Sequence, residues 1–185
     1  MPMSCKILMR IKLILLIITV LLLSCENPTP RKPVIRNSST FLNESIQRNK
    51  IINKLEESAF LELMKNDSTH DYISSANGFW YYYVNKDSVS TRFPIRGDEI
   101  IYSYSIEDIN GRVLYTEDDL GERRYIVDKQ ELITGLQDGL KLMKENEVIT
   151  FLFPSHKAYG YSGYQKIGSN QPLIYTVKLK KIIVE

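Results

Sequence analysis

The C-terminal half of the chain combines several strand patterns with one amphipathic helix, and this order most limits the possible fold. The helix pattern spans 132–143, where Leu132, Ile133, Leu136, Leu140 and Met143 share one face. Strand patterns cover 99–108, 113–116, 125–127, 147–153 and 173–184. Asn110-Gly111 should supply the positive φ angles of a tight turn between the first two strands. We therefore predict an α+β fold, in which an antiparallel sheet of four or five strands covers the only helix of this half.

The N-terminus has the pattern of an export signal. Lys6, Arg10 and Lys12 precede an apolar run over 13–23, which is too short for a membrane-spanning helix of about 20 residues. The run ends in Leu22-Leu23-Ser24-Cys25, which resembles a bacterial lipobox, so Cys25 would be lipidated and become the first mature residue. An ordinary signal peptide or a tilted anchor helix is the alternative. Removal of Cys5 with the leader would leave Cys25 as the single cysteine, which favours the lipid anchor.

Composition divides the rest of the chain. We expect a signal peptide over 1–24, a proline-rich tether over 25–39, an extension over 40–93 and the main domain over 94–185. The extension should hold a helix over 40–65, packed through Phe41, Ile52, Leu55, Ala59 and Leu63, and an aromatic strand over 78–84. We expect this helix to act as a spacer or a packing layer.

Charge and residue types exclude several functions. The formal charge is +2, and removal of the three leader cations leaves 21 basic and 22 acidic residues, or −1. A nearly neutral chain lacks the basic stripe that nucleic acids need as a partner. His70 and His156 lie far apart and neither has a second ligand at metal-binding spacing, so we expect no metal and no cofactor.

The order and spacing of several motifs resemble the FKBP-type peptidyl-prolyl cis–trans isomerase family over about half of the chain. The motifs are Arg96-Gly97-Asp98, Tyr104, Gly111, the helix segment 130–139 with Gly135 and Gly139, Ala158-Tyr159-Gly160 and the terminal strand 172–179. The resemblance implies an FKBP-like twisted sheet wrapped over one short α-helix, with the predicted helix as an N-terminal extension. It also implies isomerisation of X-Pro bonds in proline-containing polypeptides, with no cofactor.

The resemblance also assigns site residues. Tyr104, Ile133 and Tyr159 would be catalytic: the Ile133 N–H would hold the carbonyl after proline, and the Tyr159 hydroxyl the carbonyl before it. The remaining pocket positions would contact substrate, and they are Leu114, Tyr115, Tyr125, Leu132, Leu136, Ile167 and Tyr175. Leu136 would form the floor, and part of this set should also belong to the core.

Three positions depart from the family pattern. Tyr115 replaces a usual acid, Arg123 a frequent aromatic residue and Leu136 a frequent tryptophan. A non-catalytic chaperone or binding lipoprotein is therefore the alternative function. The layout is similar to that of lipoprotein isomerases associated with gliding motility. It predicts a protein anchored in the cell envelope and facing the periplasm, with Glu26 weakly favouring the outer membrane. The sequence does not define the oligomeric state.

Overall fold

The computed structural model describes residues 10, 12 and 38–184 of the chain. Of the described residues, those from Thr40 onward form one compact unit. The predicted signal peptide, Cys25 and tether lie outside the described residues, apart from Arg10, Lys12, Ser38 and Ser39. In the part that is described, no helix combines the length and the hydropathy that crossing a membrane requires.

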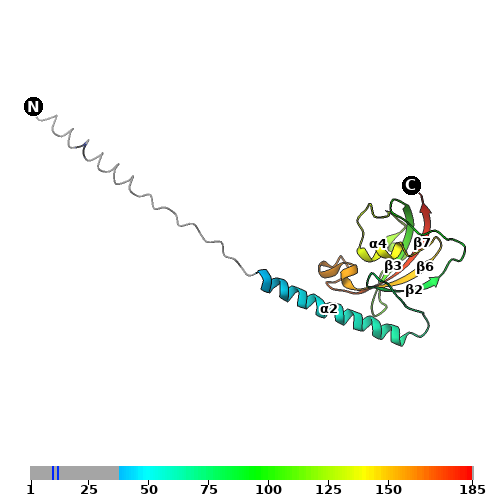
Figure 1. The fold of residues 1–185 in the computed structure, drawn as a ribbon, viewed down its shortest axis with the longest axis horizontal. Coiled ribbons are helices and arrows are strands. Elements are labelled where there is room, and N and C mark those ends of the chain that lie inside the picture. The colour runs from blue at the N-terminus through cyan, green and yellow to red at the C-terminus, as the bar shows by residue number, and fades with distance from the viewer. Residues whose placement is uncertain (1–9, 11, 13–37, 185) are drawn as a thin grey trace, which may run out of the picture. The chain divides into compact units, whose positions relative to one another are not determined.

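The compact unit is built on a seven-stranded antiparallel sheet (Figure 1). Its strands are β1 (Ile73–Ser74), β2 (Trp80–Asn85), β3 (Glu99–Asp108), β4 (Val113–Tyr115), β5 (Arg123–Ile126), β6 (Val148–Phe153) and β7 (Leu173–Ile183). The order is β1-β2-β6-β7-β3-β4, and β5 also pairs with β3. The predicted α+β class with an FKBP-like sheet is confirmed. The five strands expected in the C-terminal half are present as β3 to β7, and β1 and β2 extend the sheet to seven.

The sheet extends beyond the predicted boundary at residue 94. Strand β2 pairs with β6 from Trp80 opposite Leu152 to Tyr83 opposite Ile149. The aromatic strand expected in the extension is therefore a full member of the same sheet, and its side chains pack on the strand that leads to the long loop.

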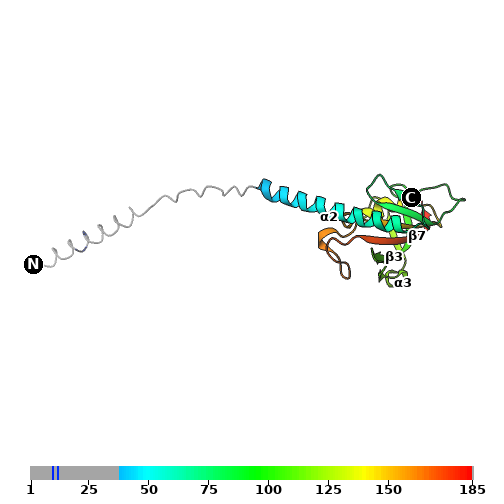
Figure 2. The ribbon, with the colours of Figure 1, turned by 90° about the horizontal axis from the view of Figure 1, so that it is seen from below.

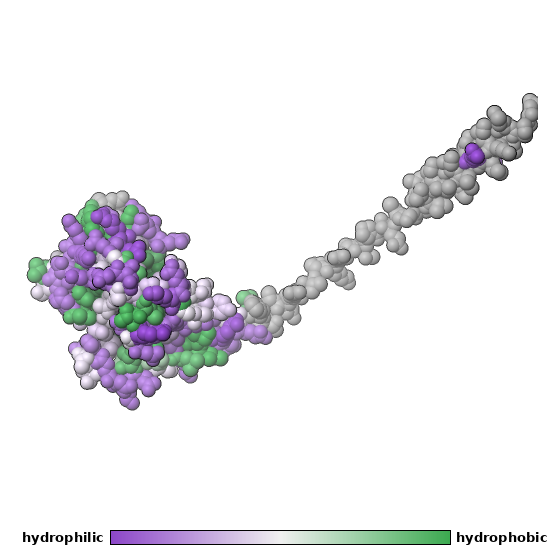
Figure 3. Space-filling view, turned by 180° about the vertical axis from the view of Figure 1, so that it is seen from behind, coloured by the Kyte–Doolittle hydropathy of each residue, from purple (hydrophilic) through white to green (hydrophobic). Residues whose placement is uncertain are grey.

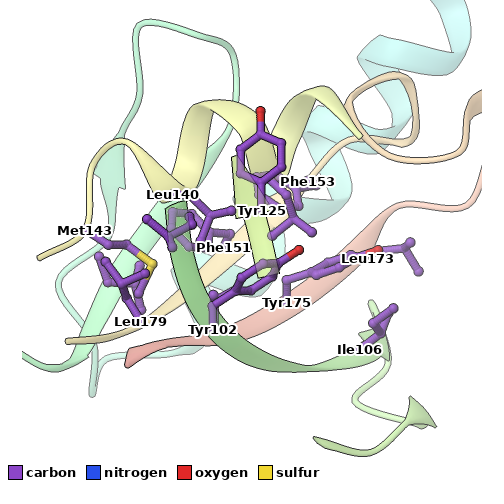
Figure 4. Packing of buried hydrophobic residues seen from close by; sticks show 14 of the residues in the cluster. Tyr102, Ile106, Tyr125, Leu140, Met143, Phe151, Phe153, Leu173, Tyr175 and Leu179 are labelled. Carbon is purple, nitrogen blue, oxygen red and sulfur yellow. The ribbon is translucent and has the colours of Figure 1, made fainter. Parts of the chain in front are cut away.

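Helix α4 (Thr134–Leu140) crosses one face of this sheet (Figure 1). A Cβ atom at Gly135 would lie 2.8 Å from the ring of Phe153, and one at Gly139 would lie 3.0 Å from the ring of Phe151. The two glycines are thus the reason the helix can lie this close to β6. The core between them includes Leu136, Leu140 and Met143, each at most 1% exposed, and Figure 4 shows how it packs.

Two details of this half differ from the sequence prediction. Helix α4 is accompanied by a second short helix, α3 (Glu117–Leu120), and by the 3₁₀ turns η1 (Ser155–Lys157) and η2 (Gly160–Ser162). Thr116 and Asp119 form a capping box that starts α3, and this pattern is a sequence signal for the beginning of a helix. In the turn after β3, Gly111 alone has a positive φ angle, 77°, because the Asp108 carboxylate accepts the N–H groups of Asn110 and Arg112.

The N-terminal helix is present as α2 (Ser38–Asn66), and its packed face agrees with the predicted one in part, since Ile52, Ala59 and Leu63 are half-buried. Leu55, expected on that face, is 66% exposed, whereas Glu56 and Phe60 are 6% and 0% exposed. Figure 3 shows apolar surface along this helix. The prediction is wrong at Leu55 because only apolar residues were assumed to form the contact, and here a hydrogen-bonded carboxyl group takes part in it.

Helices α2 and α4 lie on opposite faces of the sheet. Phe60 contacts Trp80, with ring centroids 5.8 Å apart, and Trp80 is paired with Leu152. Leu152 points away from the face that carries Phe151 and Phe153, because side chains alternate along a strand. The C-terminal half of α2 therefore covers the face that α4 does not, and Figure 2 shows this half of the helix running along the sheet.

Candidate active site

A pocket of about 550 Å³ opens between strand β3, the segment that carries α3 and β5, and the loop that follows β6. Strand β3 contributes Tyr102, Tyr104 and Ile106, and the loop contributes Tyr159 and Tyr164. Leu132, just before α4, closes one side. Aromatic and aliphatic groups thus form most of the inner wall.

The inner wall is a stack of tyrosines. The ring of Tyr104 lies 5.7 Å from that of Tyr102 and 5.6 Å from that of Tyr175, and both pairs are nearly parallel. Tyr102 and Tyr104 share a face of β3 because they are two residues apart, and Tyr175 comes from the neighbouring β7. Figure 4 shows Tyr102 and Tyr175 lying side by side on the sheet.

Burial shapes the electrostatics of this wall. It raises the pKa of Tyr102, Tyr104 and Tyr175 above the ordinary value, because a phenolate loses solvation inside the protein. Neighbouring tyrosine hydroxyls raise these pKa values further, whereas Arg123 opposes the rise for Tyr102 and Tyr104. The three hydroxyls therefore stay protonated at neutral pH. The Tyr175 hydroxyl is buried and makes no hydrogen bond of standard geometry with a described residue, although the Tyr159 hydroxyl is close enough to help raise its pKa.

Ile133 presents a backbone donor at the start of α4. Its φ and ψ angles are −57° and 139°, and its carbonyl accepts a hydrogen bond of 3.1 Å from the Gln137 N–H. Within the described residues, no group accepts a hydrogen bond from the Ile133 N–H. A backbone N–H that is left open next to a pocket residue such as Leu132 can bind a substrate carbonyl.

The loop after β6 places Tyr159 over the pocket. Its ring stacks on Tyr164 at 5.3 Å, and Tyr164 and Ile167 exchange backbone hydrogen bonds of 2.9 and 2.8 Å. Gly163 has a φ angle of 62°, and a Cβ atom there would lie 2.5 Å from the carbonyl oxygen of Ile167. The loop tip is therefore a closed structure that needs glycine at this position.

The outer rim is polar and carries several cations. The Tyr115 hydroxyl donates to Gln165 at 3.0 Å and accepts from the Lys166 N–H at 3.2 Å. The Lys166 ammonium lies 4.8 Å from the centre of the Tyr115 ring. Arg124 is paired with Glu99 at 3.2 Å, whereas Arg123 forms no ion pair with any described residue. Tyr115 thus links the strand to the loop across the rim.

The structure brings some predicted residues to the pocket surface and buries others behind it. Tyr104, Tyr115, Leu132 and Tyr159 line the pocket. Leu114, Tyr125, Leu136, Ile167 and Tyr175 are at most 8% exposed and belong to the core, while Ile133 is half-buried beside Leu132. The Tyr125 hydroxyl accepts the Asp128 N–H at 3.1 Å, which explains a polar atom in that core.

Several lining residues were missed from the sequence. They are Tyr102, Ile106, Asp119, Leu120, Arg124, Tyr164, Gln165 and Lys166, and Arg123 was noted only as a departure from the family. Tyr102 and Ile106 lie two residues before and after the predicted Tyr104 on one strand, so the alternation of side chains along a strand could have identified both. The loop residues offer no such periodicity, because their positions depend on the loop closure.

Comparisons with known proteins agree with this geometry. Residues 90–180 match the family model described as FKBP-type peptidyl-prolyl cis-trans isomerase. The chain is 30% identical over 131 residues to a probable FKBP-type peptidyl-prolyl cis-trans isomerase, FkpA, of Neisseria meningitidis serogroup B; the match covers 70% of this chain and 46% of that protein. The chain thus spans less than half the length of that relative. The crystal structure of FkpA from Escherichia coli has a similar fold, with a TM-score of 0.58 at 19% identity, covering 85% of this chain and 75% of that one.

Proposed function

Because residues 90–180 form an FKBP-type peptidyl-prolyl cis-trans isomerase domain, we propose that the chain catalyses cis–trans isomerisation of X-Pro bonds in polypeptides. The observation that best supports this activity is the open Ile133 N–H, which directly follows Leu132, a residue that lines the same pocket as Tyr104 and Tyr159. A pocket with an aromatic inner wall and an open backbone donor next to it suits a prolyl ring and its carbonyl.

The mechanism follows from amide resonance. Rotation about an X-Pro bond is opposed by roughly 18–20 kcal/mol, because the planar amide has partial double-bond character and separated charge. Water stabilises this charge separation, and a pocket that excludes water favours the twisted amide. Preferential binding of the twisted state lowers the barrier without a nucleophile or a metal. In this proposal the Ile133 N–H holds the carbonyl after proline, and Tyr159 orients the carbonyl before it.

A direct test is a prolyl-peptide isomerisation assay on residues 26–185. We expect the protein to accelerate the exchange, which takes tens to hundreds of seconds without a catalyst. The variant Tyr159→Phe should lower kcat/KM without abolishing it, since one contact of about 1.4 kcal/mol is worth roughly tenfold. A wild-type rate equal to the uncatalysed rate would falsify the enzyme proposal.

The second candidate is a binding or chaperone module with the same fold. It is favoured by the rim, where the Tyr115 hydroxyl accepts a hydrogen bond from the Lys166 N–H and the Lys166 ammonium lies over the Tyr115 ring. These contacts tie the loop to β4 at the pocket edge. The same assay separates the two functions when it is combined with a measurement of peptide affinity. Binding of a proline-containing peptide without acceleration would favour the chaperone.

The proposal also includes export and a lipid anchor at Cys25, supported by the lipobox-like sequence Leu22-Leu23-Ser24-Cys25. The substrates would then be exported or envelope proteins at the periplasmic side, with the outer membrane favoured by Glu26. The variant Cys25→Ser should lose lipid labelling and leave the membrane fraction. If it fractionates like the wild type, the anchor is wrong and the isomerase proposal is unaffected.

The gliding-motility subgroup is the finest part of the proposal, and its support is the predicted order of anchor, helix, aromatic strand and single isomerase domain. Deletion of the coding sequence in a gliding host should slow colony spreading, and the wild-type chain should restore it. Normal spreading of the deletion strain would remove this subgroup while leaving the enzyme in place.

A further inference from the structure

A buried carboxyl group joins helix α2 to the loop that carries Tyr159. Glu56 is 6% exposed, and its two oxygens accept hydrogen bonds from the N–H and the hydroxyl of Ser155, at 2.8 and 2.6 Å. The two residues are 99 positions apart, and Ser155 is itself 2% exposed. This contact lies outside the pocket and has no part in the chemistry proposed above.

Burial of Glu56 needs an explanation, because a carboxylate is costly to remove from water unless it is paired. No ion pair joins Glu56 to a cation of the described residues, so both of its oxygens are used on Ser155 alone. Helix α2 already has an apolar contact through Phe60 and Trp80. The Glu56 carboxylate therefore adds to this apolar contact a hydrogen-bonded link from the helix to Ser155.

Ser155 stands at the point where the sheet passes into the substrate loop. Strand β6 ends at Phe153, Pro154 follows, and Tyr159 comes four residues after Ser155. The Ser155 carbonyl accepts a hydrogen bond of 3.0 Å from the Ala158 N–H. The position of Ser155 therefore constrains Ala158, the residue before Tyr159. On the other side, the Lys157 ammonium lies 3.4 Å from the Asp138 carboxylate of α4. The loop start is thus held from both faces of the sheet.

We propose that Glu56 is a positioning residue of the active site: its carboxylate fixes Ser155 and thereby the place of Tyr159 over the pocket. This inference rests on the proposed isomerase function and deepens it. Helix α2 is then part of the enzyme, although it lies outside the segment that matches the family model.

The test uses the full-length chain in detergent, with Glu56→Ala, Glu56→Gln and Ser155→Ala. Glutamine can accept the Ser155 N–H and donate to its hydroxyl, so Glu56→Gln should keep near-wild-type kcat. Glu56→Ala should lower kcat about tenfold, the scale of one lost contact, with KM changed by less than about twofold. Glu62→Ala is the matched control, because Glu62 lies on the same helix and is exposed.

A purely structural role is separated by a double-mutant cycle with Tyr159→Phe. If Glu56 acts through the Tyr159 hydroxyl, Glu56→Ala should cost less than about twofold in the Tyr159→Phe background. Trp80 is the only tryptophan of the chain and contacts Phe60, so its fluorescence reports whether α2 is still docked. If Glu56→Ala does not fold, Ser155→Ala takes its place in the cycle, since it removes the hydroxyl bond and keeps the N–H bond.

The outcomes separate this inference from the proposed function. An additive cycle in an active enzyme overturns the positioning role and leaves the isomerase intact. If the wild type shows no turnover, the isomerase proposal fails, and the same cycle is measured on the Kd of a proline-containing tetrapeptide. Coupling in Kd then supports the positioning role, whereas additivity or absence of peptide binding overturns it.

Discussion

The aromatic inner wall of the pocket forms its floor, and this floor differs from the polar rim in composition and burial. The floor is the tyrosine stack of β3 and β7 packed over Phe153, and its largest members are almost fully buried. The rim includes exposed side chains such as Arg123 and Lys166, and the Lys166 ammonium donates a hydrogen bond to the Leu114 carbonyl at 3.3 Å. This difference suggests a division of labour, in which the floor excludes water from the amide and the rim selects among peptides. The predictions below test that division.

The largest effect is expected where α4 meets the floor. Gly135→Ala would bring a methyl group within 2.8 Å of the Phe153 ring, which the packed core cannot accommodate without displacing the helix. Overpacking of this kind costs roughly 1–3 kcal/mol, and urea unfolding should show the loss. Gly139→Ala is the graded comparison, with a 3.0 Å contact to Phe151, and should cost less. An unchanged unfolding midpoint for Gly135→Ala would mean that the helix is not fixed by this contact.

A proline substitution can remove the backbone N–H of Ile133 with little other change. The φ angle of Ile133 is −57°, which proline adopts, and no described residue uses the Ile133 N–H. Ile133→Pro should therefore fold and should lower kcat/KM about tenfold relative to Ile133→Ala, which keeps the N–H. Equal rates for the two variants would show that the N–H does not hold the substrate.

The sequence predicted the floor better than the rim, and the reason is periodicity. The bounds of β3 were predicted correctly because apolar residues alternate along it, and the apolar stripe over 132–143 identified the segment that contains α4. Tyr164 to Lys166 lie in a loop whose shape depends on the left-handed Gly163 and on contacts with Tyr115. Glu56 was missed for a related reason, since a pattern of apolar residues does not mark a buried carboxylate. The catalytic roles of Tyr104, Ile133 and Tyr159 stay predictions.

Removal of the buried Tyr175 hydroxyl should have a smaller effect and should stabilise the protein, whereas the Gly135 change destabilises it. A buried hydroxyl without a partner lowers stability, because its desolvation is not repaid. Tyr175→Phe should therefore raise the free energy of unfolding by up to about 1 kcal/mol and leave kcat within about twofold. Thermal unfolding and the peptide assay measure both quantities. A loss of stability would show that the hydroxyl is hydrogen-bonded in solution, and a loss of kcat would give the floor a polar role.

The smallest effect is expected at the rim, where charge acts through water. Arg123 has no ion-pair partner among the described residues, while Arg124 is bound to Glu99 and Lys166 lies over Tyr115. Peptides with glutamate before proline should therefore be isomerised up to about fivefold faster than lysine peptides, the scale of an exposed ion pair. Arg123→Gln should reduce this preference, and so should about 0.5 M salt, which screens exposed charges. Arg112→Gln is the control, because Arg112 is paired with Asp108 in the turn after β3. If the preference survives Arg123→Gln unchanged, the rim does not select by this charge, and the floor alone accounts for the specificity.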